Sequence, residues 1–239
     1  MQVMKIFGVL LLSVVAIFSQ ANAQNSVSRK DSMALAALYQ RCGGDSWRTG
    51  WDLNLPVETW DGIKISEGRV QEIHLRSNNL SGNLPEETGN LTALRSLDLS
   101  NNRLTGQLPS GIAQLTELQM LNLSGNGFNG EIPPAYGNLS QLQNMLLSGN
   151  QLSGIIPAQL GRLSQLQQIV LDNNQLYGNI PQELGNLQNL VVFSASNNQL
   201  EGTVPESFAR LRKLRMLNLT DNLIEASVLE RWNQILLRQ

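Results

Sequence analysis

The chain has 239 residues, of which 41% are hydrophobic and 15% charged, a composition typical of an ordered domain and not of a disordered segment. Its formal net charge is −2, and its basic residues are scattered along the chain instead of forming a run. Both features argue against nucleic acid and anionic membrane surfaces as ligands, because both of those ligands attract concentrated positive charge.

The start of the chain, residues 1–23, has the composition of a signal peptide. Lys5 gives a positive start, residues 6–18 form an uninterrupted stretch without charge, and Ala21-Asn22-Ala23 matches the small-x-small cleavage pattern. The apolar stretch is shorter than the roughly 20 residues that span a bilayer. We therefore expect cleavage after Ala23 and export to the periplasm, cell surface or medium, with no membrane insertion of the mature chain. An uncleaved anchor is the alternative.

A constant sequence period, whose length is the interval from Pro85 to Pro109, organises most of the remaining chain. In the unit formed by residues 93–116, leucines stand at positions that are also apolar in the neighbouring units. Three other residue types recur at this spacing: proline at Pro85, Pro109, Pro133, Pro157, Pro181 and Pro205; asparagine at Asn78, Asn102, Asn126, Asn150, Asn174, Asn198 and Asn222; and glycine at Gly82, Gly106, Gly130, Gly154, Gly178 and Gly202.

The periodic residues predict how one unit folds. Around Leu97 and Leu99, apolar and polar residues alternate, which predicts a strand with one buried face. One strand cannot bury that face alone, so successive units are expected to stack into a parallel sheet with strands about 4.8 Å apart. The asparagine would satisfy backbone groups where the chain leaves the strand. The glycine would permit a tight turn, and the proline would open the convex side.

The repeat resembles the plant-type leucine-rich repeat. The shared pattern is LxxLxLxxNxLxGxIPxxLGxL, seen for example in residues 165–188. This resemblance implies an α/β repeat solenoid, namely a leucine-rich-repeat right-handed horseshoe with a parallel concave β-sheet, an N-terminal helical cap and a C-terminal helix cap. It implies a fold more specifically than a ligand, because one fold can carry many functions.

The segment before the repeats resembles the N-terminal cap of that family. Asp31 is expected to cap a helix that ends at Gly43-Gly44. The apolar residues of this helix are Met33, Leu35, Leu38 and Tyr39. The tryptophans Trp47 and Trp51 and the stretch 60–63 then look like the family's run into the first strand.

Plant members carry paired cysteines around that stretch, whereas Glu58 and Ile65 occupy those positions in this chain, so the disulfide is absent. The single cysteine, Cys42, is expected to be a small buried apolar residue near the helix end rather than a reactive thiol. Cysteine-free caps of this kind are similar to those of secreted and surface bacterial leucine-rich-repeat proteins, notably from Bacteroidetes.

The seventh unit begins at Leu214 and then departs from the pattern, with Ala226 in place of the glycine and Leu229 in place of the proline. The apolar residues that follow lie at helical spacing and predict a C-terminal cap: Val228, Leu229, Trp232, Ile235 and Leu236. A partner-binding helix is the alternative. The predicted domains are a signal peptide at 1–23, the N-terminal cap at 24–68, seven repeats at 69–222, the last incomplete, and the cap helix at 223–239.

Function is expected on the outward positions of the concave strands, which the scaffold leaves free. Several of these positions carry apolar side chains and predict a partner-binding strip: Met120, Leu146, Val170, Val192 and Met216. Asn122, Asn144 and Gln168 are polar members of the same candidate site. Isolated apolar residues are common on protein surfaces, so the strip stays a hypothesis at this stage.

A charged cluster is expected at the N-terminal end of the same face, from Glu72, His74, Arg76 and Asp98. We interpret it as an ion-pair network and not as a metal site, because zinc needs three or four suitable ligands and the arginine opposes a cation. The chain also has only one histidine and no nucleophile, phosphate-loop or metal-ligand motif. The sequence therefore predicts neither catalysis nor a cofactor.

These observations predict an exported binding module that recognises a protein ligand through its concave face, in recognition or adhesion. A glycan-binding module is the second hypothesis, and it is less favoured because the outward concave positions carry no aromatic residue for stacking against a sugar. The third is a structural component of the cell envelope. A plant-like receptor ectodomain is disfavoured because no transmembrane segment or kinase follows the repeats.

Overall fold

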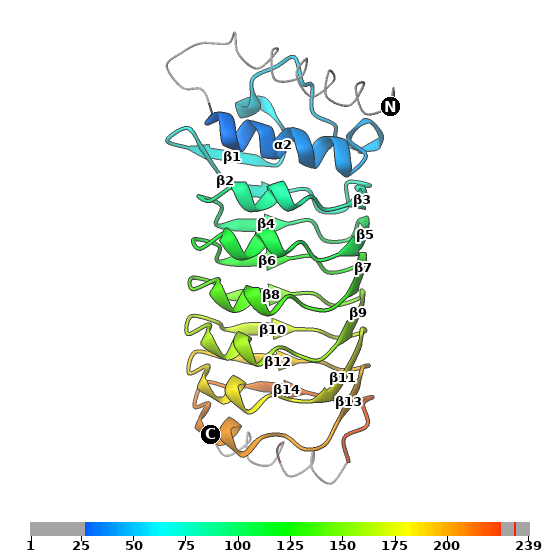
Figure 1. Ribbon diagram of the computed structural model, residues 1–239, viewed down its shortest axis with the longest axis vertical. Coiled ribbons are helices and arrows are strands. Elements are labelled where there is room, and N and C mark those ends of the chain that lie inside the picture. The colour runs from blue at the N-terminus through cyan, green and yellow to red at the C-terminus, as the bar shows by residue number, and fades with distance from the viewer. Residues whose placement is uncertain (1–26, 226–231, 233–239) are drawn as a thin grey trace, which may run out of the picture.

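The computed structural model of the chain describes residues 27–225 and Trp232. The predicted signal peptide lies outside these residues, as does the predicted C-terminal cap helix apart from residues 223–225 and Trp232. The protein is an elongated stack of coils, with the N-terminal cap at one end (Figure 1). Each complete coil adds a strand, a second strand and a short helix, in that order.

The first strands of the coils form an eight-stranded sheet, the concave sheet, in the order β1-β2-β4-β6-β8-β10-β12-β14. All pairs are parallel except β1–β2. The middle residue of the central strands is fully buried, for example Leu97, Leu121 and Ile169. The strands are β1 (Ile63–Ser66), β2 (Arg69–His74), β4 (Ser96–Asp98), β6 (Met120–Asn122), β8 (Asn144–Leu146), β10 (Gln168–Val170), β12 (Val192–Ser194) and β14 (Met216–Asn218). The predicted parallel sheet is confirmed, and β1 of the cap extends it.

The coils also build a second sheet of six strands, which the sequence analysis did not predict. Its strands are all parallel and run along one edge of the stack (Figure 1). They are β3 (Ser81–Asn83), β5 (Arg103–Gln107), β7 (Gly127–Gly130), β9 (Gln151–Gly154), β11 (Gln175–Asn179) and β13 (Gln199–Glu201). The recurring glycines therefore lie in or beside these strands and not in separate tight turns, although they do have positive φ, as at Gly106 (φ 79°) and Gly178 (φ 75°).

A 3-10 helix forms the convex side of each coil. Each begins directly after the recurring proline, whose fixed φ is compatible with a helix start and which has no N–H to leave unpaired. The helices are η3 (Glu86–Asn90), η4 (Ser110–Gln114), η5 (Pro134–Asn138), η6 (Ala158–Arg162), η7 (Gln182–Asn186) and η8 (Glu206–Arg210). The predicted role of the prolines in opening the convex side is confirmed.

The recurring asparagines connect each coil to the one before it. The Asn150 amide donates to the carbonyls of Leu123 (3.1 Å) and Leu147 (3.0 Å), while its oxygen accepts from the Phe128 N–H (3.1 Å). The same three-way pattern recurs at Asn102, Asn126, Asn174, Asn198 and Asn222. Asn78 extends it into the cap by bonding both backbone groups of Thr49.

The N-terminal cap begins with α2 (Arg29–Arg41), which lies over the first coil (Figure 1). Asp31 does not cap this helix as predicted; the N-cap is Ser28, and Asp31 sits in the first turn, fully buried. From there its carboxylate accepts bonds from Ser28 Oγ, Arg69 Nε (3.1 Å) and Val70 N (2.8 Å). The sequence pattern could not show this, because Arg69 lies 38 residues away in β2.

The tryptophans of the cap pack as a cluster in place of a disulfide. Trp51 stacks on Trp60, with ring centroids 4.6 Å apart, and meets Trp47 edge-on at 4.8 Å. Tyr39 packs against both Trp47 and Trp51. Of the other residues predicted for the helix face, Leu35 and Leu38 are buried, but Met33 is 44% exposed.

Cys42 ends α2 as its C-cap residue and is fully buried, as predicted. Gly43, which follows it, is in the left-handed conformation and stops the helix. Burial raises the pKa of the Cys42 thiol to about 12. The thiol is therefore protonated as well as covered at neutral pH.

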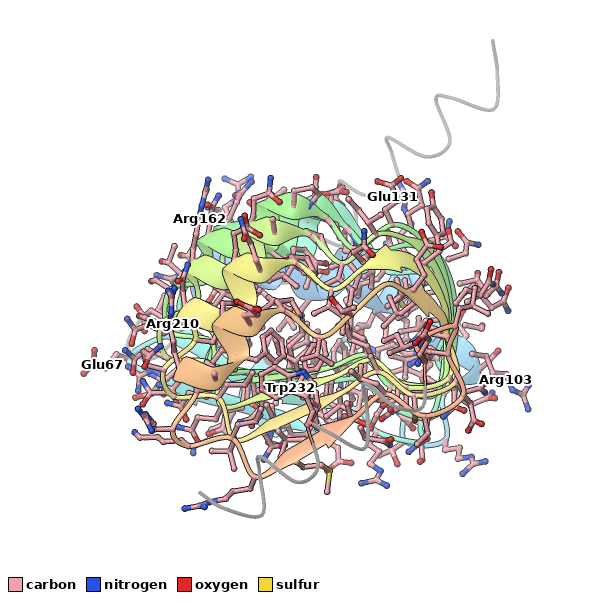
Figure 2. All side chains as sticks on the ribbon, turned by 90° about the horizontal axis from the view of Figure 1, so that it is seen from below. Glu67, Arg103, Glu131, Arg162, Arg210 and Trp232 are labelled. Atoms are coloured by element: carbon pink, nitrogen blue, oxygen red, sulfur yellow. The ribbon has the colours of Figure 1, made fainter. Side chains whose placement is uncertain are left out.

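At the opposite end, Trp232 reaches the interior of the stack (Figure 2). Its ring lies edge-on to Phe208 of η8, 6.5 Å away, and Phe208 in turn meets Phe193 at 5.7 Å. An apolar side chain from the predicted C-terminal cap thus covers the last apolar layer.

Replacing one ladder asparagine should destabilise the protein strongly. In Asn150→Ala, two buried carbonyls and one buried N–H lose their partner, so we expect a loss of about 3 kcal/mol in unfolding free energy. Urea denaturation followed by circular dichroism measures it. Asn138→Ala, at an exposed position on η5, is the control and should change little. Equal stabilities of the two variants would contradict this role of the ladder.

Cys42 should resist thiol reagents until the protein unfolds. Because the pKa of the thiol is about 12, the thiolate fraction at pH 8 is smaller than that of a free cysteine by about three orders of magnitude. We expect labelling by a chromogenic disulfide to be at least about a hundredfold slower in buffer than in urea. Rapid stoichiometric labelling of the folded protein would show that the cap opens readily.

Candidate functional site

The candidate site is the apolar strip on the outer face of the concave sheet. Strand register brings its members together in two pairs. Leu146 lies opposite Val170 across β8 and β10, and Val192 lies opposite Met216 across β12 and β14. Met120 lies opposite Asn144 and therefore one diagonal step from Leu146. The strip crosses the sheet obliquely instead of following one column.

The exposure of these side chains increases toward the C-terminal end of the stack. Met120, Leu146, Val170 and Val192 are half-buried, while Met216 is 53% exposed. Their buried neighbours along each strand belong to the core, so the strip rests on a rigid apolar layer. It can bury further apolar area only against another molecule.

The polar residues predicted for the site border the strip. Asn122 lies opposite Leu146, and Gln168 lies opposite both Asn144 and Val192. All three are half-buried. Part of the hydrogen-bonding capacity of Asn122 is already used, because its Oδ1 accepts from the Ser124 N–H (3.2 Å). Asn144 and Gln168 thus offer the freer amides, each directly beside an apolar neighbour.

A carboxylate holds the polar side of the strip in place. Asp172 Oδ1 accepts from Ser194 Oγ (2.6 Å), from Ser196 Oγ (2.6 Å) and from the Ser196 N–H (2.7 Å). Ser194 is consequently buried, although the alternation of the strand places it on the outer face. These bonds cross from one coil to the next, so they fix the spacing of the strands beside Val170 and Val192.

The charged cluster predicted at the N-terminal end forms only in part. Glu72 pairs with Lys64 of β1 (2.6 Å) and lies 3.8 Å from His74, whose Nε2 is 2.9 Å from Ser96 Oγ. Asp98 turns away and accepts from Ser100 (Oγ, 2.6 Å) instead. The sequence analysis missed Lys64, because the antiparallel hairpin β1–β2 and not the repeat brings it there.

The second sheet has an outer face of its own, and the sequence analysis did not consider it. Figure 2 looks along the stack and shows Arg103 of β5 and Glu131, just after β7, pointing outward on this side. The same face carries two exposed apolar residues, Ile155 and Tyr177. A signal was present in the sequence, since Leu176 stands between outward Gln175 and Tyr177 with the period of a strand.

Within residues 27–225 and Trp232, no helix has the length and apolarity needed to cross a membrane. Over the same residues, no three histidine, cysteine or carboxylate side chains converge in a way that could hold a metal ion.

Comparisons with known proteins agree with this architecture. A family model described as a leucine-rich repeat region matches residues 69–175, and further leucine-rich-repeat models match residues 179–224 and 165–187. Together these matches cover most of the two sheets.

Solved structures similar to this chain include plant receptor proteins. The PEPR1–AtPEP1 structure has a TM-score of 0.76 and 32% identity over 82% of this chain and 29% of that one. The plant peptide hormone receptor RGFR1 in complex with RGF2 has a TM-score of 0.56 and 33% identity, over 65% of this chain and 29% of that one. Pollen Receptor Kinase 3 has a TM-score of 0.67 and 33% identity, over 74% of this chain and 87% of that one.

The chain spans less than a third of the length of the first two of these structures, which are therefore longer proteins that contain a comparable stretch of coils. It spans most of the third. The repeat, the two sheets and these matches agree: the chain belongs to the leucine-rich-repeat family.

Proposed function

We propose that this protein is an exported binding module that recognises a protein ligand through its concave face, in recognition or adhesion, and that it does not catalyse a reaction. The observation that carries the proposal is the oblique apolar strip formed by Met120, Leu146, Val170, Val192 and Met216. It combines partly exposed apolar side chains with a rigid support, which is what a protein-binding surface requires.

The strip suits an extended segment of a protein ligand. Two apolar pairs, Leu146–Val170 and Val192–Met216, lie one coil apart and provide separate contact points for apolar side chains. The amides of Asn144 and Gln168 can bond a ligand backbone between them, since an amide both donates and accepts. Two of the similar structures bear titles that name a receptor together with AtPEP1 or RGF2, which supports a ligand of this class.

Little free energy is needed to prepare this surface for binding. The asparagine ladder and the Asp172 bonds already hold the strands in register, so few main-chain groups have to be ordered when a ligand arrives. The adaptable side chains on the strip are the two methionines, Met120 and Met216, which can fit an irregular partner.

Export is part of the proposal and rests on residues 1–23 of the sequence, with their positive start, apolar stretch and small-x-small site. The cysteine-free cap supports a location like that of the secreted and surface bacterial proteins it resembles. Stability there would come from the tryptophan cluster and the ladder, since a single cysteine cannot form an intramolecular disulfide.

A charge at the centre of the strip should abolish binding without unfolding the protein. We expect Val170→Asp to weaken saturable binding of the labelled mature chain to intact cells of the source organism by at least about tenfold, because a desolvated carboxylate would face an apolar contact. Gln141→Asp introduces the same charge at an exposed position away from the strip and should bind as wild type. Thermal unfolding should be similar for both variants.

Prior protease treatment of the cells should remove this binding if the ligand is a protein. Binding that survives protease treatment would contradict the proposed ligand class, and binding that survives Val170→Asp would contradict the proposed site.

A further inference from the structure

The outer face of the second sheet carries an aromatic platform at Tyr177. In β11 the side chains of Gln175, Tyr177 and Asn179 point outward, while Leu176 between them is buried. The Tyr177 side chain is 51% exposed. A tyrosine in this position displays an apolar ring to water with no partner from its own chain among the described residues.

Strand register places an equally exposed aliphatic side chain beside the ring. Because Gln175 pairs with Ser153 and Leu176 with Gly154, the next residues in register are Tyr177 and Ile155, and Ile155 is 58% exposed. Gly178 leaves space beside the ring: a Cβ there would meet Ile155 Cγ2 at 3.2 Å. The aliphatic side chain therefore extends over the glycine, next to the ring.

The repeat does not require either residue. The positions equivalent to Tyr177 in the other coils are small or polar: Ser81, Thr105, Asn129, Ser153 and Glu201. Those equivalent to Ile155 are polar as well: Asn83, Gln107, Glu131, Asn179 and Thr203. Two polar columns are thus interrupted by apolar residues in adjacent coils, at the two points that register brings together. Scattered surface apolar residues would not be expected to coincide in this way.

Neutral amides surround the platform. Tyr177 pairs with Gln199 of β13, while Gln175 and Asn179 flank it along its own strand. Within the part of the chain that the structure describes, none of these three amides makes a side-chain hydrogen bond, unlike the amides of the asparagine ladder. Glu201, opposite Asn179, is the charge at the corner of the platform.

We propose that this platform is a second binding site, which takes a neutral polysaccharide. A pyranose ring with equatorial hydroxyls has a face of C–H groups, and this face suits the negative face of an aromatic ring and the aliphatic surface of Ile155. The hydroxyls at its rim both donate and accept, which matches the free amides of Gln175, Asn179 and Gln199. Uncharged ligands are favoured because the platform itself offers no charge to pair with an ionic group.

This site is separate from the concave strip. The two lie on different sheets, and Tyr177 is contributed by the second strand of its coil, whereas Val170 is contributed by the first. The inference therefore does not depend on the proposed protein ligand, and each site can be changed without the other.

The test is titration of the purified mature protein with a panel of neutral hexasaccharides, namely cellohexaose, laminarihexaose, xylohexaose and mannohexaose, followed by calorimetry and saturation-transfer NMR. We expect at least one to bind saturably, with transfer from the tyrosine ring. Tyr177→Ala should weaken that binding at least about tenfold, while Tyr177→Phe, which keeps the ring, should retain it. Val170→Asp should bind the sugar as wild type.

A folding check accompanies the alanine variant. Because the side chain of Tyr177 is largely outside the core, thermal unfolding of Tyr177→Ala should match wild type, and loss of binding then reports the site itself. Three results would overturn the proposal: no saturable binding across the neutral panel, unchanged binding in Tyr177→Ala, or a self-association of the protein that the same variant abolishes.

Discussion

The buried asparagine ladder is the interaction on which the rest of this structure depends. Each asparagine, such as Asn150 or Asn174, closes two carbonyls and one N–H where the chain turns out of the concave sheet. These backbone groups are buried and no sheet or helix partner is available to them, so an unsatisfied ladder would be costly. Because one group in each set comes from the preceding coil, the same bonds close the turn and join the coils. The constant length of the repeat follows from the need to return the asparagine to the same place in every coil.

The ladder also explains why the outer faces can vary. Leucines fill the interior, and asparagine, glycine and proline shape the turns, so the side chains on the outside of both sheets contribute little to folding. Each face can therefore hold its own binding surface. The concave sheet presents an apolar strip supported by the Asp172 bonds, and the second sheet presents an aromatic platform between free amides. Two ligands of different chemistry could then be held on one rigid rod, with no conformational change needed to connect them.

The caps solve the problem that stacking creates at each end. The first coil would expose apolar area above it, and α2 with the Trp47–Trp51–Trp60 cluster covers that area. Plant members of the family are expected to brace this region with a disulfide, whereas this chain places a buried carboxylate, Asp31, between Ser28, Arg69 and Val70. Trp232 packs against Phe208 at the other end. Apolar packing with one buried ion pair thus replaces covalent bracing, which is consistent with an oxidising compartment being unnecessary for this fold.

The sequence by itself determined the solenoid, because a fixed period forces each unit into the same environment and leaves stacking as the only way to bury its leucines. It determined the parallel concave sheet, the roles of asparagine and proline, and the burial of Cys42, since each follows from local chemistry repeated in register. Only the tertiary structure decided which residues from different coils become neighbours. The pairing of Glu72 with Lys64, the burial of Asp31 and Ser194, and the meeting of Ile155 with Tyr177 all depend on strand register. Register is a relation between strands, and in the second sheet it differs from the repeat: Tyr177 pairs with Gln199, whereas its equivalent in the next coil is Glu201. The period alone therefore does not reveal which side chains meet there.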